Sequence, residues 1–288
     1  MNKGRIIKII SNQYTILTNE GNHLPSLAMG KLRKGVSPVV GDNVLYDVED
    51  GKGLIQEILP RKNYLVRPLI ANVDQAVVVM SVVDPDFSYV LVDQLIFLIC
   101  YQNITPVLLL TKTDLIEDRN KVDKIVNEYQ SGGYQVFTTG IGENEEIITS
   151  ILKDKITVLT GQSGVGKSSL LNRIDSNFKL STQEISKALG RGKHTTRHVQ
   201  LYEVAGGWIA DTPGFSSLDF SEIDSKVLKD CIIDFQKSTS CKFRDCTHVN
   251  EPGCNVKKMV DEGLISKIRY ENYLQILPSC NLVKEWER

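Results

Sequence analysis

The segment Gly161-Gln-Ser-Gly-Val-Gly-Lys-Ser168 constrains this chain more than any other feature of its sequence. It fits the pattern G-x-x-x-x-G-K-[ST] at every fixed position and lies between a predicted strand (156–159) and a predicted helix (168–174). Glycines let backbone N–H groups close around a phosphate, and the helix N-terminus adds its positive end. The segment therefore predicts a phosphate-binding loop on an α/β sheet. The alternative is a glycine-rich turn that carries a lysine by chance.

Three successive compositions predict three domains. Residues 1–66 form short alternating β-like segments separated by glycine turns, which predict a small β-barrel. Residues 67–221 alternate strands with helices, as in a parallel sheet covered on both faces. Residues 222–288 are mixed and contain a Cys/His cluster.

Composition excludes several classes of protein. The 288 residues carry 34 Lys+Arg and 35 Asp+Glu, so bulk charge gives no case for a nucleic-acid or membrane partner, and any basic surface must be local. No apolar run approaches the ~18–20 residues that span a bilayer, and the first residues lack the apolar core of a signal peptide. We therefore expect a cytoplasmic monomer, without a membrane partner, whose six cysteines stay reduced.

A second motif bears on the choice of nucleotide base. Thr111-Lys-Thr-Asp114 follows a predicted strand (106–110) and resembles the N-K-x-D motif that reads guanine in GTPases. The Asp114 carboxylate would accept hydrogen bonds from the ring N–H and exocyclic amine of guanine, a pair that adenine does not offer. Thr111 stands in place of the usual Asn, so the sequence does not show whether the hydrogen bond that this Asn supplies is made here. The alternative is a helix N-cap at Asp114.

A third motif, Asp211-Thr-Pro-Gly214, ends a predicted hairpin and resembles the D-x-x-G segment of GTPases. Asp211 would bind Mg²⁺ through water, and the Gly214 N–H would sense the γ-phosphate. The alternative is a simple Pro-Gly turn. Because this segment leads directly into residues 222–288, we hypothesise that loss of the γ-phosphate repositions the C-terminal domain.

The polar segment 190–197 precedes the hairpin and fits the switch that GTPases order around the nucleotide. Thr196, or alternatively Thr195, would complete the Mg²⁺ shell. Phe215 stands where Ras-like enzymes carry a water-positioning Gln, and Phe cannot orient water. His194 is the nearest candidate catalytic residue, since imidazole can hydrogen-bond water or accept a proton near neutral pH. The alternative is a solvated or RNA-facing His194.

The order of these motifs differs from that of ordinary GTPases. The guanine motif comes first, at 111, followed by the phosphate loop at 161, the switch at 190–197 and D-x-x-G at 211. A circular permutation explains this order and leaves every motif at the carboxyl end of a strand.

Cys241, Cys246, His248 and Cys254 follow the pattern C-x₄-C-x-H-x₅-C. Three thiolates and one imidazole suit a closed, structural Zn²⁺ site with no open position for catalysis. The alternative is a set of unrelated reduced thiols. We expect Cys100, Cys231 and Cys280 to be packed structural thiols.

Together these residues resemble the ribosome small subunit-dependent GTPase A family of circularly permuted bacterial GTPases. The resemblance covers nearly the whole chain and includes Gly41-Asp42, the junction Leu59–Pro68, Ala71–Gln75, the segment Gly190–Thr196, the GTPase motifs and the Cys/His cluster. Thr111 is its main departure from the family pattern.

The resemblance implies an OB-fold in residues 1–66, a circularly permuted GTPase domain in 67–221 and a mainly helical zinc-binding domain in 222–288. It implies binding to the small (30S) ribosomal subunit and its 16S rRNA during late maturation, with hydrolysis of GTP to GDP and phosphate stimulated by that subunit. Eight cationic side chains are candidates for binding rRNA phosphates: Lys31, Arg33, Lys34, Arg61, Lys62, Arg191, Lys193 and Arg197. The alternative for each is ordinary solvated charge.

The expected ligands of this chain are GTP with Mg²⁺ and one structural Zn²⁺. The expected nucleotide-binding residues are Thr111, Lys112, Thr113, Asp114, Gly161, Gln162, Ser163, Gly164, Val165, Gly166, Lys167, Ser168, Ser169, Asp211 and Gly214. The expected magnesium ligands are Ser168, Thr196 and Asp211. Two other hypotheses stay open: an RNA-binding module with a nearly inactive nucleotide site, and a P-loop kinase or ATPase.

Overall fold

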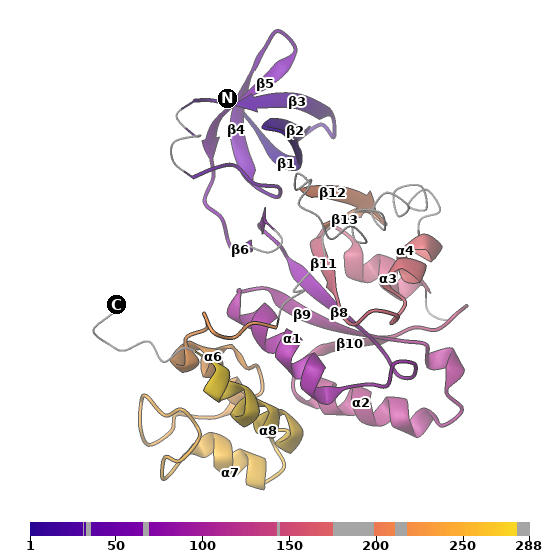
Figure 1. The fold of residues 1–288 in the computed structure, drawn as a ribbon, viewed down its shortest axis with the longest axis vertical. Helices are drawn as coiled ribbons and strands as arrows, with labels where there is room; N and C mark the ends of the chain where they lie inside the picture. Colours follow the sequence, from indigo (N-terminus) through magenta and orange to yellow (C-terminus); the bar gives the residue numbers. More distant parts are fainter. Residues whose placement is uncertain are drawn as a thin grey trace. The chain divides into compact units, whose positions relative to one another are not determined.

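The computed structural model of the chain describes residues 1–30, 32, 36–65, 69–142, 145–174, 199–210 and 218–280. These residues form two compact units (Figure 1). The first unit comprises Met1–Ala76, Glu145–Leu159 and Lys167–Ser216, and the second comprises Val77–Asn144, Thr160–Gly166 and Ser217–Arg288. Neither unit is one continuous stretch of sequence, because each combines segments from different parts of the chain.

The first unit begins with a closed five-stranded barrel, at the N-terminal, indigo end of the chain in Figure 1. Its strands are β1 (Asn2–Ile10), β2 (Gln13–Thr18), β3 (His23–Ala28), β4 (Asn43–Glu49) and β5 (Lys52–Ile58). They pair in the order β1-β2-β3-β5-β4, and β4 closes the barrel on β1. This Greek-key order, with β3 parallel to β5, confirms the expected OB-fold. Side chains with no exposed surface fill its interior, among them Ile6, Ile16, Val44 and Ile55.

Strand β3 had no clear signal in the sequence, because Pro25 interrupts its alternation of apolar and polar residues. In the structure Pro25 lies opposite Thr15 of β2 and is exposed. A proline cannot donate a ladder hydrogen bond, yet the strand still pairs with β2 on one side and β5 on the other.

The rest of the first unit carries the strand that precedes the phosphate loop. Strand β11 (Ile156–Thr160) runs parallel to β13 (Gly207–Ala210), and β13 forms a hairpin with β12 (Val199–Val204). Strand β12 in turn pairs antiparallel with barrel strand β1, with Lys8 opposite Gln200. Helices α3 (Glu145–Leu152) and α4 (Lys167–Ile174) contact each other.

The second unit contains three strands in the order β10-β9-β8 and the helices beside them. The strands are β8 (Gln75–Ser81), whose first two residues belong to the first unit, β9 (Thr105–Thr111) and β10 (Gln135–Thr138), and the helices are α1 (Tyr89–Tyr101) and α2 (Arg119–Ser131). All seven residues of β8 are buried, as expected for a strand covered on both faces. These elements confirm the predicted strand-helix alternation, with boundaries shifted by a few residues.

The C-terminal part of the second unit is mainly helical, as expected. It contains α6 (Ser225–Cys231), α7 (Asn255–Asp261) and α8 (Lys267–Ile276), and both α6 and α8 pack on α1. Helix α1 is apolar on most sides because it has helices as well as strands for neighbours. Within the described ranges, no helix has the length and apolar character needed to cross a bilayer.

A buried arginine fixes α8 on α1 and α2. Arg269 is 1% exposed, and its guanidinium donates to Asp93 of α1 (Nε–Oδ1 3.3 Å) and to Asp234. The guanidinium also lies over the rings of Tyr129 and Tyr134, with 4.5 and 4.8 Å between its carbon and the ring centroids. Burial raises the pKa of Asp93 to about 6, although Arg269 opposes this shift.

We expect Arg269→Met to destabilise the protein by about 3–5 kcal/mol, since it leaves two buried carboxylates without their cation. Urea unfolding measures this loss. Lys267→Met on the same helix is the matched control, because it removes only an exposed pair with Glu271 and should cost less than about 0.5 kcal/mol. Equal stability of the two variants would show that the cluster does not hold α8.

Candidate nucleotide site and metal centre

The phosphate loop has the backbone that its sequence predicted. Strand β11 ends at Thr160 and helix α4 begins at Lys167, so residues 161–166 connect a strand to a helix. Gly161 has φ 132°, and a Cβ atom there would lie 2.0 Å from the carbonyl oxygen of Val79 in β8. Only glycine fits so close to another backbone. Gly164 and Gly166 have φ values of 83° and 94°, which side chains disfavour.

Lys167 is the cation of this loop. It is the first residue of α4 and is half-buried. Burial lowers the pKa of its ammonium, because the charged form loses part of its hydration. Ser168 and Ser169 follow in the first turn and are exposed, so both hydroxyls are accessible from solvent.

The motif at the end of β9 lies against the phosphate loop. The Thr111 hydroxyl is buried, donates to the carbonyl oxygen of Val165 at 2.6 Å, and lies 3.3 Å from that of Met80. The structure therefore brings Thr111 and Val165 together, although 54 positions separate them in the chain. A threonine at this position therefore supplies a hydrogen bond that braces the loop.

The two residues after Thr111 form a tight turn. Lys112 has φ 59°, in the left-handed region, and Thr113 begins a short 3₁₀ turn, η2 (Thr113–Leu115), that contains Asp114. Thr113 is 1% exposed and Asp114 is half-buried. The Lys112 ammonium donates to the backbone carbonyl of Asp84, in the loop that follows β8.

Two further loops flank these motifs, and no sequence motif marked them. The loop after β10 begins at Thr139, which is fully buried and donates its N–H to Leu110 at 2.8 Å. The loop after β8 is held by the Ser81 hydroxyl, which donates to the Pro85 carbonyl at 2.7 Å. The signal that could have found both loops is their position after strands of one sheet, where ligands bind in α/β folds.

Several expected site residues lie outside the described part of the chain. They are His194, Thr195, Thr196, Asp211, Gly214 and Phe215. The hairpin that connects these segments is described, and β13 ends at Ala210, directly before Asp211. Its turn residues Ala205 and Gly206 both have positive φ, as a two-residue hairpin turn requires.

The four predicted zinc ligands converge. The ligand atoms of Cys241, Cys246, His248 and Cys254 all lie within 4.8 Å of one another. His248 Nδ1 lies 3.7 Å from Cys241 Sγ and 3.4 Å from Cys254 Sγ. Bond lengths of about 2.3 Å to sulfur and 2.0 Å to nitrogen give ligand separations of about 3.5–3.8 Å in a tetrahedral zinc site. The donor set and its spacing therefore fit zinc.

Neighbouring groups fix the loops that carry these ligands. Tyr270 and Tyr273 of α8 donate their hydroxyls to the carbonyls of His248 and Thr247, each at 2.7 Å. Glu251 accepts from the Thr247 N–H and hydroxyl, and from a further backbone N–H. Burial alone would raise the pKa of Glu251, but these hydrogen bonds lower it to about 2.

The remaining cysteines take no part in this centre. None of the six cysteines, all of which lie in the described ranges, forms a disulfide. Burial raises the pKa of Cys100 to about 12 and also raises that of Cys280. Burial therefore favours the neutral thiol at both positions, as expected for a packing role.

Of the eight cations considered for rRNA, the described residues include only Arg61 and Lys62. Arg61 donates to both carboxylate oxygens of the fully buried Asp42, at 2.6 and 2.8 Å, and lies over the ring of Tyr64. Lys62 pairs with Asp74. Arg61 is therefore engaged with a buried carboxylate, whereas Lys62 forms an ion pair that stays exposed to solvent.

The site and its topology define a circularly permuted P-loop GTPase joined to an OB-fold barrel and a Cys₃His metal centre. A model of the RsgA GTPase family matches residues 58–221, and a model of the RsgA N-terminal domain matches residues 3–55. The chain belongs to the RsgA GTPase family, and it is a GTP hydrolase.

Relatives match over nearly the full length. The chain is 45% identical over 284 residues to the small ribosomal subunit biogenesis GTPase RsgA of Bacillus cytotoxicus, covering 96% of this chain and 97% of the relative. It is 44% identical over 288 residues to the protein of the same name from Bacillus subtilis, again covering 96% and 97%.

Two solved structures share the fold. The circularly permuted GTPase YloQ matches with a TM-score of 0.83 and 39% identity, covering 96% of this chain and 94% of that chain. YjeQ from Thermotoga maritima matches with a TM-score of 0.84 and 35% identity, covering 96% and 97%. The expected permuted GTPase fold is thus confirmed.

We expect Thr111→Val to weaken binding of GDP by roughly 5- to 150-fold, because it leaves the buried Val165 carbonyl without its donor. Titration with a fluorescent GDP analogue measures the affinity. Thr111→Ser keeps the hydroxyl and should bind within about threefold of the natural protein. Equal affinities of the valine and serine variants would contradict a bracing role for the hydroxyl.

Proposed function

We propose that this chain is a GTPase that binds the small (30S) ribosomal subunit and its 16S rRNA during late maturation of the subunit. The observation that carries the proposal is the near full-length similarity to proteins named small ribosomal subunit biogenesis GTPase RsgA. The OB-fold barrel supports it, because barrels of this class bind oligonucleotides. The protein acts as a monomer in the cytoplasm, where it meets the subunit.

In the proposed nucleotide complex, the backbone of residues 161–166 surrounds the phosphates and Lys167 reaches the β- and γ-phosphates. Ser168, Thr196 and Asp211 would hold Mg²⁺, which would supply positive charge beside the phosphates. The remaining loop residues, Gln162, Ser163 and Ser169, complete the phosphate contacts, and the Gly214 N–H contacts the γ-phosphate.

Base recognition belongs to the turn after β9. Asp114 accepts two hydrogen bonds from guanine, and the Lys112 stem covers a face of the base. Thr111 and Thr113 support this turn from its buried side. Thr111 also donates a hydrogen bond to the phosphate loop. This geometry favours GTP over ATP, because adenine offers no such pair of donors to Asp114.

Intrinsic hydrolysis is expected to be slow, because Phe215 cannot orient the attacking water. We propose that the subunit completes the catalytic geometry and that His194 positions the water. Turnover of GTP should therefore be low alone and rise strongly with purified small subunits, with ATP as the control substrate. Unchanged turnover with intact subunit binding would favour an RNA-binding module, and a preference for ATP would favour a kinase or ATPase.

The same assay tests His194. His194→Ala should lower subunit-stimulated turnover while subunit binding is retained. A stimulated rate equal to that of the natural protein would remove His194 from the catalytic step.

For the metal centre, we propose one structural Zn²⁺ held by Cys241, Cys246, His248 and Cys254. The purified protein should contain about one zinc per chain, and Cys246→Ser should lose it, because a closed tetrahedral site needs all four ligands. Elemental analysis measures the content. Cys231→Ser, outside the cluster, is the control and should keep its zinc. Retention of zinc by Cys246→Ser would contradict the proposed ligand set.

A further inference from the structure

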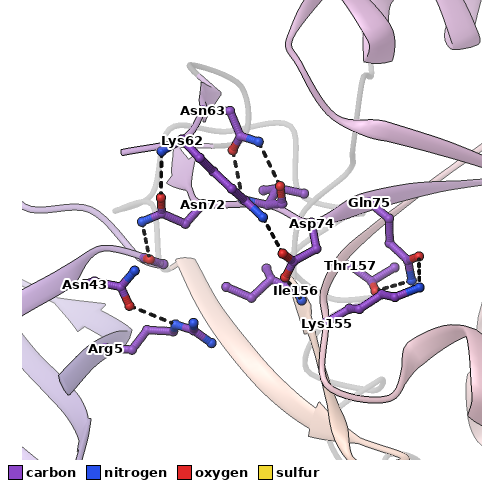
Figure 2. Close-up of polar contacts among 12 residues, drawn as sticks. Arg5, Asn43, Lys62, Asn63, Asn72, Asp74, Gln75, Lys155, Ile156 and Thr157 are labelled. Atoms are coloured by element: carbon purple, nitrogen blue, oxygen red, sulfur yellow. Dashed lines mark hydrogen bonds and ion pairs between the residues drawn. The ribbon is translucent and has the colours of Figure 1, made fainter. Parts of the chain in front are cut away.

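Side chains supply much of the bonding at the junction between the barrel and strand β8, residues 59–74, and at Gln75, the first residue of β8. The described backbone pairing of this junction comprises the short strands β6 (Tyr64–Leu65) and β7 (Ile70–Ala71) and a bridge between Val40 and Ile70. Four polar side chains supply further contacts, and we refer to them as the clasp: Asn63, Asn72, Asp74 and Gln75. Figure 2 shows the clasp with its partners. Asn63, Asn72 and Gln75 are buried, with 9%, 6% and 2% of their surface exposed.

Toward the barrel, the clasp holds the turn before β4. The Asn72 amide donates to the Gly41 carbonyl at 2.9 Å, and its oxygen accepts from the Lys62 N–H at 3.0 Å. Gly41 has φ 88°, and a Cβ atom there would lie 2.0 Å from the Ala71 carbonyl oxygen. The Gly41 N–H donates to Ile6 of β1 at 2.8 Å. The turn is therefore fixed both to the clasp and to the barrel wall.

The Asn63 side chain pairs with the backbone of Val73 in the way that a neighbouring strand would. Its side-chain amide donates to the Val73 carbonyl at 2.8 Å, and its side-chain oxygen accepts from the Val73 N–H at 2.9 Å. Both backbone polar groups of Val73 are thus satisfied by one buried side chain. Loss of the Asn63 side chain would leave the buried N–H and carbonyl of Val73 without these partners. The position of Val73 relative to Asn63 is therefore strongly favoured.

Toward the nucleotide loop, the clasp binds the first residues of β11. The Asp74 carboxylate accepts from the Ile156 N–H at 2.7 Å, and the Asp74 N–H donates to the Ile156 carbonyl at 2.9 Å. The Gln75 amide donates to the Ile151 carbonyl at 2.7 Å and to the Thr157 hydroxyl at 3.0 Å. Strand β11 then continues directly into the phosphate loop.

These contacts close a ring of hydrogen bonds. From β11 the ring passes to β13, where Ile156 lies opposite Trp208, then across the hairpin to β12 and from β12 back to β1 of the barrel. The barrel is therefore attached to the strands around the nucleotide loop at two places. Because the buried Asn72 and Gln75 and the half-buried Asp74 connect the described residues of the barrel turn and β11, a displacement of the barrel should alter the position of β11.

We propose that the clasp transmits subunit contact at the barrel to the phosphate loop, which makes Asn63 and Asp74 positioning residues for subunit-stimulated hydrolysis. This rests on the proposed function. The described side-chain bonds of Asn63 are with Val73, and those of Asp74 are with Lys62 and Ile156. Ile156 is the first residue of β11, whereas the phosphate loop follows the last residue of that strand. Loss of these bonds should therefore affect coupling while basal nucleotide binding is unchanged. Hydrogen-bond networks of this kind carry coupling between separate sites.

The test compares Asn63→Ala and Asp74→Ala with Lys62→Met in the full chain. Asp74→Ala removes the acceptor for Ile156, whereas Lys62→Met removes only the partly exposed ion pair with Asp74 and keeps that acceptor. For each protein, basal GTP turnover, KM for GTP, affinity for purified small subunits and subunit-stimulated turnover are measured. Circular dichroism and thermal unfolding establish that each variant is folded.

The two alanine variants should keep basal turnover, KM and subunit affinity within about twofold, while stimulation falls by roughly 5- to 150-fold, the range of a typical coupling between sites. Lys62→Met should keep full stimulation. Full stimulation in the alanine variants overturns the clasp proposal alone. Proportional loss of basal and stimulated turnover also overturns it, because that is the effect of a purely structural role. Absence of stimulation in the natural protein overturns the proposed function and the coupling with it.

Discussion

The approach of the phosphate loop to strand β8 is the constraint on which the site depends. Gly161 lies where any side chain would collide with the Val79 carbonyl, so the loop begins in contact with the end of a neighbouring strand. That contact leaves Val165 within reach of the Thr111 hydroxyl, which binds the loop to the end of β9. A buried hydrogen bond therefore joins the phosphate loop to the turn that begins at Thr111. A change in the position of one should alter the position of the other.

The features that depend on neighbouring residues in the sequence were predicted correctly. The glycine spacing at 161–166, the alternation of the barrel strands and the Cys/His spacing each appear in the sequence, and the structure contains the loop, the barrel and the clustered ligands. Contacts between distant residues were not predictable in this way. Arg61 and Lys62 looked like loop cations because their partners, Asp42 and Asp74, carry no signal that would pair them. The pairing of β12 with β1 joins segments whose sequences contain no common motif.

Thr111 departs from the Asn of the family pattern and donates a hydrogen bond to the phosphate loop. In the sequence, this departure left one supporting hydrogen bond of the N-K-x-D motif open. A hydroxyl at the end of β9 reaches the Val165 carbonyl at 2.6 Å because the two backbones lie close together. A shorter side chain is sufficient when the acceptor is this near. A buried hydroxyl donor at this position is therefore sufficient to join the end of β9 to the phosphate loop.

The cluster around Arg269 bears on how the C-terminal segment relates to the rest of the fold. Its carboxylate partners come from α1, which precedes the guanine motif, and from the segment before the metal ligands. Repositioning that segment after phosphate release would require α1 to move with it or the buried ion pairs to break. The segment that carries the Cys/His cluster therefore shares its core with α1 and does not form a separate domain. A chain that stopped before this segment would expose the apolar flank of α1 and leave Asp93 without a counter-ion, so helices near the C-terminus complete a core that contains α1.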